Sequence, residues 1–342
     1  MKLLILTQAV DSTDTTLGFF VRWISSLAVR FEKVTVICLR EGVHTLPANV
    51  TVYCLRGPSY IGKLHIAGKF LHLIWMLRRE YDSAFVHMNQ EYVLLGGLFW
   101  RLLHKKIFLW RNHRVGDWKT ALAVTFSQKV FYTSRDSFTA HFANAVEMPA
   151  GIDVELFEKN EGEERKKNSL LMFGRVAPVK HIEMAIEAMA ALKERGVEAT
   201  LSVVGDALSK DQGYLQSLKD RAEALGVDNQ VYFQKGVPFA QAPALYHAYE
   251  IFLNFTPSGS FDKTVFEALA AGCKVLVTND SMKGILPDGS WTDANREHVA
   301  DKIQRLLSLD VAAEHTYKED AVRILTSQSL DALVGKLVQL MI

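Results

Sequence analysis

The stretch SLLMFGRVAPVKHIEMAIEAMAALKERGVEATLSVVGD, residues 169–206, contains a short apolar run, a polar loop, a helical pattern and a second apolar run. Gly196 ends the helical pattern, as glycine commonly does one residue beyond a helix. The two apolar runs are short and show little alternation, which is typical of parallel strands covered by helices on both faces. This strand–helix–strand unit predicts a doubly wound α/β fold.

The same alternation extends through the rest of the chain. In the first half we predict strands at 2–8, 33–39, 50–55, 83–87, 106–110 and 129–132, with helices near 17–31, 62–79 and 91–103. After residue 206 we predict helix 213–225, strand 230–235, helix 240–250, strand 251–257, helix 261–271, strand 274–278 and a helical tail from 293. The two halves share this pattern without a detectable sequence repeat.

The length of 342 residues favours two domains. The polar segment 153–169 loses all periodicity and is interpreted as a linker. We therefore predict two Rossmann-like domains facing across a cleft, at 1–152 and 170–325, followed by a C-terminal helix at 326–342. Packing of that helix back on the N-terminal domain is one arrangement considered.

The bulk composition is that of a globular protein, with 49% hydrophobic and 23% charged residues. The longest apolar run, 92–100, is too short to span a bilayer. The apolar N-terminus resembles a buried strand more than a signal peptide. Cys38, Cys54 and Cys273 are odd in number and scattered, so neither a disulfide framework nor a metal site is expected. These features predict a cytoplasmic protein.

Charge is distributed unevenly along the chain. Residues 1–150 carry 18 Lys and Arg against 10 Asp and Glu, a net charge of +8, and residues 151–342 carry 21 against 28, a net charge of −7. The segment 60–81 combines Trp75 and aliphatic residues with four cations, Lys63, Lys69, Arg78 and Arg79. It is either a core helix with a solvated face or a peripheral contact with an anionic membrane.

Ligands of open parallel sheets bind beyond the carboxyl ends of the strands, where helix N-termini point. Distinctive residues follow the predicted strands at those ends: Gly18, His87 and Asn89, His113, Gly174 and Arg175, Gly205 and Asp206, and 258–260. The sequence therefore places its candidate binding residues along one edge of each sheet.

Two of these loops contain groups suited to a nucleotide. Arg175 and Lys180 are placed to grip a diphosphate, with two solvated surface cations as the alternative. With Ser260 as an expected N-cap, the backbone N–H groups of residues 263–265 would face a phosphate. Glu267 would then accept hydrogen bonds from ribose hydroxyls, or merely form an ion pair with Lys263.

Four motifs in the second half resemble those of a known family. They are FGRVAPVKHIEMAIEAM, LSVVGDA, TPSGSFDKTVFEALAAGCKVLVTN and PAGID, the last at 149–153. They resemble the donor-binding half of retaining glycosyltransferases with the two-domain GT-B fold, in the large family numbered four. The resemblance is strongest over residues 146–280.

The resemblance implies roles for individual residues. Arg175 and Lys180 would bind the donor diphosphate and Glu267 the ribose; the other implied donor contacts are Gly18, Gly205, Lys263, Thr264 and Val265. His113, in the segment IFLWRNHRVGDW, matches a histidine near the transferred sugar, although it could be a surface residue. His87 and Asn89 are candidates for binding the acceptor.

One position departs from the family pattern. Gly259 stands where the family has the first glutamate of its E-x7-E motif, eight residues before Glu267. Asp262 resembles the acid of an S-x-D-K variant, and it would either contact the sugar or favour the helix N-terminus. The expected catalytic residues are therefore His113 and Asp262.

The resemblance predicts a retaining hexosyltransferase that uses a UDP- or GDP-linked sugar, needs no metal and binds no nucleic acid. The acceptor would be a glycan or a lipid-linked saccharide in cell-surface polysaccharide assembly, reached by a cytoplasmic enzyme that is peripheral on the inner face of the membrane. A nucleotide-sugar epimerase of the same fold and a non-catalytic sugar-nucleotide binding protein remain alternatives. A dinucleotide dehydrogenase is disfavoured because no G-x-G-x-x-G follows a predicted strand.

Overall fold

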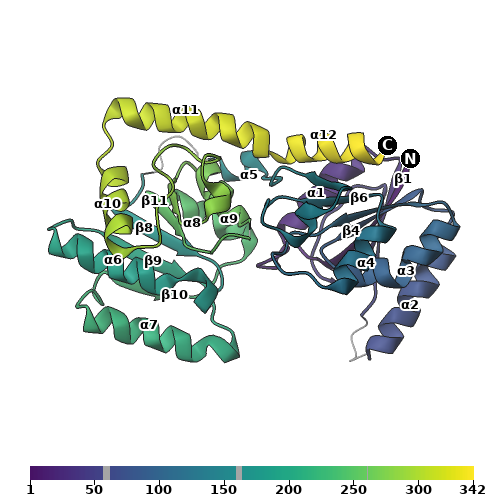
Figure 1. Ribbon diagram of the computed structural model, residues 1–342, viewed down its shortest axis with the longest axis horizontal. Helices are drawn as coiled ribbons and strands as arrows, with labels where there is room; N and C mark the ends of the chain where they lie inside the picture. The colour runs from purple at the N-terminus through teal and green to yellow at the C-terminus, as the bar shows by residue number, and fades with distance from the viewer. Residues whose placement is uncertain (57–61, 159–163, 260) are drawn as a thin grey trace. The chain divides into compact units, whose positions relative to one another are not determined.

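The computed structural model describes residues 1–56, 62–158, 164–259 and 261–342. The chain forms two compact units (Figure 1). The first comprises Met1–Gly151 together with Leu330–Ile342, and the second comprises Ile152–Ser329. Within the expected linker 153–169 a short helix, α5 (Val154–Phe157), forms in the second unit, and residues 159–163 lie outside the described residues.

The first unit is built on a seven-stranded parallel sheet with the order β3-β2-β1-β4-β5-β6-β7. Its strands are β1 (Lys2–Val10), β2 (Lys33–Glu41), β3 (Val50–Cys54), β4 (Ser83–His87), β5 (Lys106–Trp110), β6 (Lys129–Tyr132) and β7 (Ala145–Glu147). Its helices are α1 (Phe19–Ala28), α2 (Lys63–Met76), α3 (Gln90–Leu102), α4 (Trp118–Phe126), η1 (Phe138–His141) and α12 (Leu330–Met341). The strand order reverses direction between β1 and β4.

Apolar residues pack on both faces of this sheet. Along β1, Leu3 and Ile5 belong to a cluster that includes α1 and α12, whereas Leu4 and Leu6 belong to a cluster that includes α2 and α3. All four side chains are fully buried. Successive residues of a strand point to opposite faces, so a strand covered on both sides must be apolar at every position. This explains the absence of alternation in the sequence.

The second unit is built on a five-stranded parallel sheet with the order β10-β9-β8-β11-β12. Its strands are β8 (Ser169–Phe173), β9 (Thr200–Val204), β10 (Val231–Gln234), β11 (Ile251–Asn254) and β12 (Lys274–Val277). Besides α5, its helices are η2 (Pro178–Lys180), α6 (Ile182–Glu194), η3 (Ser209–Asp211), α7 (Gln212–Ala224), η4 (Phe239–Gln241), α8 (Ala242–His247), α9 (Lys263–Ala270), η5 (Asp280–Met282), α10 (Arg296–Leu307) and α11 (Val311–Gln328). Here the order reverses between β8 and β11.

The last helix of the chain, α12, packs in the first unit. Leu333, Leu337 and Met341 are fully buried in the same cluster as Trp23 of α1. The Lys336 ammonium donates a hydrogen bond of 2.7 Å to the carbonyl of Glu147 at the end of β7. The apolar face of α12 therefore completes the core of a sheet whose strands all lie in the first half of the sequence.

Three elements of the first unit were not predicted, namely α4, β7 and the four-residue η1. Helix α4 begins with a capping box, in which the Asp117 carboxylate accepts the Thr120 N–H at 3.0 Å. An aspartate three residues before a threonine was the available signal, but the helix is only nine residues long. Strand β7 has three residues and is too short for a pattern to show. The tail from residue 293 is helical as expected, but it is divided into α10, α11 and α12.

The glycines that follow β8 and β9 allow two loops to approach closely. A Cβ atom at Gly205 would lie 1.8 Å from the carbonyl oxygen of Gly174. This is far closer than two non-bonded atoms can approach, so any side chain at Gly205 would clash with the loop. Gly174 itself has a φ of +131°, a region that strongly favours glycine. Among the described helices, none is both long enough and apolar enough to cross a membrane.

Gly205→Ala should lower the free energy of unfolding by about 2 kcal/mol or more, because the backbone must shift to admit the methyl group. Gly213→Ala is the matched control: its Cβ would meet nothing within 4 Å, and alanine favours the helix α7 by up to about 1 kcal/mol. Urea denaturation of the two variants measures the difference. Equal stabilities would contradict the close approach of the two loops.

Candidate functional site

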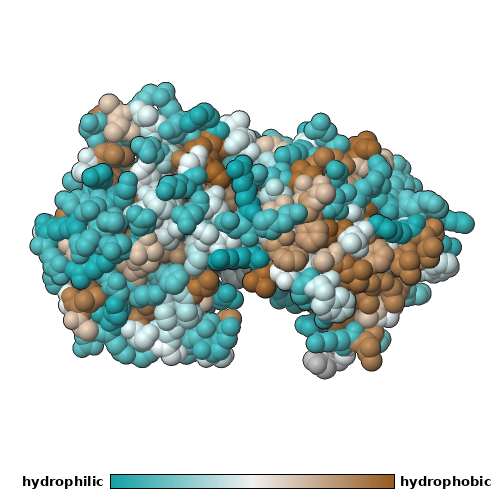
Figure 2. Space-filling model, in the orientation of Figure 1, coloured by the Kyte–Doolittle hydropathy of each residue, from teal (hydrophilic) through white to brown (hydrophobic). Residues whose placement is uncertain are grey.

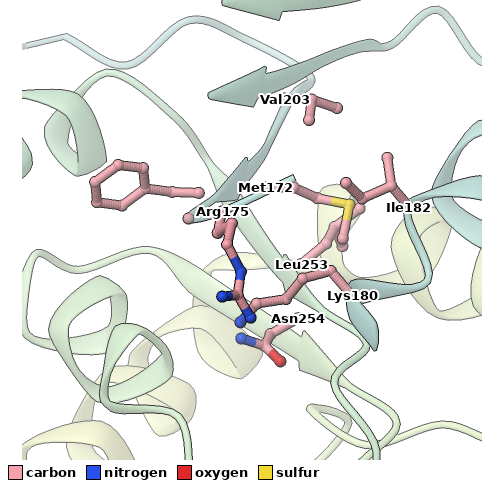
Figure 3. A pocket seen from close by; sticks show the side chains of 9 residues that line it. Met172, Arg175, Lys180, Ile182, Val203, Leu253 and Asn254 are labelled. Carbon is pink, nitrogen blue, oxygen red and sulfur yellow. The ribbon is translucent and has the colours of Figure 1, made fainter. Parts of the chain in front are cut away.

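The candidate site lies at the carboxyl ends of β8 and β11, where the strand order of the second unit reverses. In doubly wound sheets this reversal opens a crevice, because the connections leave the two strands toward opposite faces. One pocket occurs there (Figure 3). It is lined by Met172, Phe173, Gly174, Arg175, Lys180, Ile182, Val203, Leu253 and Asn254.

The loop after β8 is held in place by its neighbours. The Val176 N–H donates to the carbonyl of Asp206 at 3.1 Å, which ties the loop to the one after β9. The chain then makes the turn η2 and passes through His181, whose φ is +47°, into α6. The Tyr214 hydroxyl of α7 accepts the Ile182 N–H at 3.1 Å and donates to the Glu183 carboxylate at 2.5 Å. The Ile182 N–H at the start of α6 thereby has an acceptor. The loop before it places Arg175 and Lys180 in the lining of the pocket.

Two cations converge on this pocket. Figure 3 shows the Arg175 and Lys180 side chains lying next to each other beside Asn254. Arg175 is exposed, and among the described residues no acidic side chain forms an ion pair with it. Lys180 has a single acidic partner in the described chain, Asp262, at 2.5 Å. The pocket therefore presents positive charge that exceeds its negative charge, which suits an anionic ligand.

Asp262 connects the loop after β8 to the helix after β11. One of its oxygens accepts hydrogen bonds from Lys180 and from the Asn254 amide, at 2.5 and 2.8 Å. The other accepts the Thr264 hydroxyl at 2.7 Å. Burial alone would raise the pKa of the Asp262 carboxyl, but Lys180 and these hydrogen bonds outweigh it and lower the pKa to about 2. Asp262 is therefore a carboxylate at neutral pH.

The N-terminus of α9 differs from the expected one. Asp262 is the N-cap, with its side chain accepting the Thr264 N–H at 3.3 Å, and the predicted cap Ser260 lies outside the described residues. The Val265 N–H donates to the carbonyl of Asp262 at 3.3 Å. These two N–H groups, expected to bind a phosphate, already have acceptors in Asp262. Aspartate is among the strongest N-caps, which explains the two-residue difference.

Glu267 is buried in α9, with 7% of its surface exposed. It accepts a hydrogen bond of 3.2 Å from the Tyr246 hydroxyl and is one turn from Lys263. Burial raises the pKa of Glu267 to about 7, against the opposing effect of Lys263, and burial also lowers the pKa of Lys263 well below its usual value. Both groups are thus shifted toward their neutral forms. Glu267 does not line the described pocket, and its role in ribose binding stays a prediction.

Gly259 occupies a backbone conformation that favours glycine. Its φ is +99°, where a residue with a side chain would be strained. Its N–H points to the Ser281 hydroxyl at 3.5 Å, and the Ser258 hydroxyl accepts the Asp280 N–H at 3.0 Å. These hydrogen bonds join the loop after β11 to η5. The loop makes a tight turn at Gly259, where a glutamate would not fit without strain.

The expected residues of the first unit follow β1, β4 and β5, but they lie in different environments. Gly18 caps α1 with an ordinary helical φ of −54°, so its position does not require glycine. The His87 ring is 3% exposed and stacks on Phe20 with ring centroids 4.0 Å apart. Asn89 is half-buried, and its side-chain oxygen accepts a hydrogen bond of 2.7 Å from Gln8 of β1. His87 is thus part of the core, whereas Asn89 links two strand ends at the reversal point.

His113 follows β5 and keeps contact with solvent. Partial desolvation by the surrounding protein and the neighbouring Arg111 lower the pKa of its ring. The ring is therefore neutral at pH 7 and can accept a hydrogen bond. Its carbonyl accepts the Phe138 N–H at 2.8 Å, which fixes the loop. The roles expected for His113, His87, Asn89 and Gly18 stay predictions.

Sequence reasoning missed two features of these sites. Asn254 is buried at the end of β11 and orients Asp262; a lone amide at the end of the apolar run IFLN was the available signal. Met88 has a φ of +69° between His87 and Asn89, and its carbonyl accepts a hydrogen bond of 3.4 Å from Arg111. Nothing in the sequence indicates that strained backbone, which is the kind often found at functional sites.

The raised pKa of Glu267 predicts a pH-dependent stability. Between about pH 4.5 and 7 the folded protein keeps the Glu267 proton that the unfolded chain has lost, so this group's contribution to stability falls as pH rises through that window. Glu267→Gln removes this dependence. The difference in unfolding free energy between variant and parent should shift in favour of the variant by up to about 3 kcal/mol from pH 5 to pH 8.

Denaturant titrations at pH 5, 6, 7 and 8 measure the shift. Glu223→Gln on the exposed side of α7 is the matched control and should show no trend. A Glu267→Gln difference that is constant across this range would contradict the burial of an ionisable carboxyl at this position.

Comparison with known proteins gives a consistent result. Residues 153–322 match the family model described as glycosyl transferases group 1. Mannosylfructose-phosphate synthase of Agrobacterium fabrum is 31% identical over 32% of this chain and 25% of its own length. A GDP-mannose-dependent alpha-(1-6)-phosphatidylinositol monomannoside mannosyltransferase of Mycolicibacterium smegmatis is 25% identical over 59% of this chain and 58% of its own length. The chain thus spans less than two thirds of both curated relatives.

The fold of the whole chain is similar to that of solved structures. Anabaena Alr3699/HepE, crystallised in complex with UDP and glucose, superimposes with a TM-score of 0.79 at 17% identity, covering 100% of this chain and 99% of that one. Two parallel-sheet α/β units of the GT-B class are therefore confirmed. The segment that matches the glycosyl transferases group 1 model, residues 153–322, spans nearly all of the second unit, Ile152–Ser329.

Proposed function

We propose that this protein is a retaining glycosyltransferase that moves a hexose from a UDP- or GDP-linked sugar to a hydroxyl of a glycan or lipid-linked saccharide, in cell-surface polysaccharide assembly and without a metal. The observation that carries the proposal is the convergence of Arg175 and Lys180 at the reversal point of a group 1 glycosyltransferase unit. Relatives whose names include a GDP-mannose donor and a phosphatidylinositol mannoside support the donor and acceptor classes.

The proposed catalysis is electrostatic. When the bond from the sugar to the diphosphate breaks, negative charge develops on the leaving phosphate. Arg175, which has no acidic partner among the described residues, offers a planar fork of donors for that phosphate, and Lys180 adds a second positive charge. Groups held in place before the reaction stabilise such charge without reorganising. In same-face attack the leaving phosphate itself would accept the proton of the attacking hydroxyl, so no carboxylate nucleophile is needed.

Asp262 and Lys180 would exchange partners when the donor binds. In the structure the Lys180 ammonium is 2.5 Å from the Asp262 carboxylate. A diphosphate competes for the same ammonium, and the weakened ion pair leaves Asp262 able to accept hydrogen bonds from sugar hydroxyls. With a pKa of about 2 it would act as a charge and not as a proton donor. Asp262 would thereby take the place of the acid that the family motif has at the position of Gly259.

The remaining expected roles complete the proposal. Glu267 would accept hydrogen bonds from the ribose hydroxyls, and its pKa of about 7 would fall once such donors are present. Neutral His113 would accept a hydrogen bond from the transferred sugar. Asn89, whose side chain is half-buried, is better placed than His87 to meet an acceptor directly.

Arg175→Ala and Lys180→Ala should each weaken the binding of UDP and GDP by about 10- to 100-fold, since each removes a charge-assisted phosphate contact worth about 1.5–3 kcal/mol. Arg175→Ala should leave the melting temperature unchanged because it breaks no ion pair of the described residues. Calorimetry measures the affinities, with Lys219→Ala on the exposed face of α7 as control. Unchanged affinity in Arg175→Ala would remove it from the donor site.

The reaction itself is tested with a panel of UDP- and GDP-hexoses and saccharide acceptors. Proton NMR of the first product should show that the anomeric configuration of the donor is kept. An inverted product would contradict the retaining mechanism. Release or epimerisation of the sugar without an acceptor would favour the epimerase, and nucleotide binding without turnover would favour the non-catalytic binding protein.

Asp262→Asn tests the proposed exchange in the same assay. Asparagine is an equally good N-cap, so the fold of α9 should be kept. Transfer should fall at least about tenfold, while affinity for UDP or GDP should stay equal or rise because Lys180 is released. Asp220→Asn on exposed α7 is the control. Unaltered transfer by Asp262→Asn would leave Asp262 with a structural role only.

A further inference from the structure

Three helices of the first unit expose apolar side chains away from the core. Apart from Met76, which adjoins Trp75, these residues recur on each helix at spacings of three, four or seven, so they form a stripe on the outward face. They are Leu64, Leu71, Trp75 and Met76 on α2, Leu95, Leu98 and Leu102 on α3, and Trp118 and Leu122 on α4. Their exposed fractions run from 40% to 90%. Apolar residues grouped in this way differ from the single exposed apolar residues that are common on protein surfaces. We call this set of nine residues the apolar face.

Two adjacent glycines bring the three helices of the apolar face together. A Cβ at Gly96 would lie 3.2 Å from Ile74 of α2, and one at Gly97 would lie 3.0 Å from Phe126 of α4. Helix α3 therefore packs closely against a neighbour on each side. The Trp75 ring of α2 also contacts Phe99 of α3, with centroids 5.7 Å apart. Figure 2 shows hydrophobic residues gathered over these helices in the first unit.

Cations surround the apolar face. Between residues 63 and 126 the chain carries ten Lys and Arg against four Asp and Glu, a surplus of six positive charges. Two of these cations lie over aromatic rings of these helices. The Arg78 guanidinium lies 4.4 Å from the centre of the Trp75 ring of α2, and the Arg101 guanidinium lies 5.5 Å from the centre of the Phe126 ring of α4. Lys63, Arg79 and Lys119 are exposed at the helix ends.

We propose that the apolar face docks on the surface of an anionic lipid bilayer. Apolar side chains with tryptophan, bordered by lysine and arginine, are the composition that inserts at the headgroup boundary of a membrane. Exposed lysines are depleted at protein–protein interfaces, whereas each basic residue near an anionic leaflet strengthens binding about fivefold. The one-sided charge therefore favours lipid over a protein partner or a second copy of this chain.

This inference stands apart from the proposed transfer reaction. Every residue of the apolar face belongs to the first unit, and the donor-binding cations belong to the second. Docking needs neither nucleotide nor sugar. A failure of the docking experiment would therefore leave the glycosyltransferase proposal untouched, and the reverse also holds.

The experiment is co-sedimentation of the full chain with vesicles of phosphatidylcholine alone or with about 30% phosphatidylglycerol. The protein should sediment with the anionic vesicles at low salt and be released at about 0.5 M salt, where charge is screened within a few ångströms. Leu98→Ser combined with Leu102→Ser should reduce the partition coefficient at least about tenfold. Val311→Ser combined with Val322→Ser, equally exposed on α11, should leave it unchanged.

Reversal of charge tests the contribution of the basic residues to membrane binding. Lys63→Glu, Arg79→Glu and Lys119→Glu together should abolish binding to anionic vesicles, whereas Lys219→Glu with Lys235→Glu on the second unit should not. Negligible binding of the parent protein to both kinds of vesicle would overturn the proposal. So would equal binding by the serine or the charge-reversed variants, and so would concentration-dependent dimerisation that the serine variant abolishes.

Discussion

The ion pair between Lys180 and Asp262 is the contact on which the second unit's site depends. It joins a loop that follows β8 to a helix that follows β11, across the point where the strand order reverses. Asp262 is at the same time the N-cap of α9 and the acceptor of the Asn254 amide. A single carboxylate therefore fixes the start of a helix, the position of a lysine and the orientation of a buried amide. Removing an anion from such a network leaves several donors without an acceptor.

The same network keeps both Lys180 and Asp262 charged. Two cations at one pocket would repel each other, and Asp262 offsets one of them. Its low pKa shows that the surroundings favour the ionised form of the carboxyl despite burial. Further along α9, burial is the dominant effect on Glu267 and Lys263, and it shifts the pKa of each toward the neutral form. The charge of the site is therefore concentrated at the helix start, where a ligand can reach it.

Much of the fold could be predicted from the sequence because both sheets are parallel. Short apolar strands, helical stripes and terminating glycines such as Gly196 indicate doubly wound units directly. The first residue of α9 was harder to predict than the strands, since Ser260 and Asp262 are both good N-caps. Only the path of the backbone shows that Asp262 is the cap. Periodicity also could not show that His87 turns inward onto Phe20, because a residue at the end of a strand can face either the core or the crevice. The sequence showed that Gly259 stands at the position of an acid, but only the structure shows its φ of +99°.

The return of α12 to the first unit makes that unit discontinuous in sequence. The chain passes between the units at residues 151–152 and again at 329–330. Met341 and Leu337 fill the core beside Trp23, so residues up to about 341 must leave the ribosome before the first core can close. The second unit is continuous and can fold earlier. During synthesis the first sheet therefore exposes apolar surface until α12 emerges, and exposed apolar surface of this kind favours aggregation.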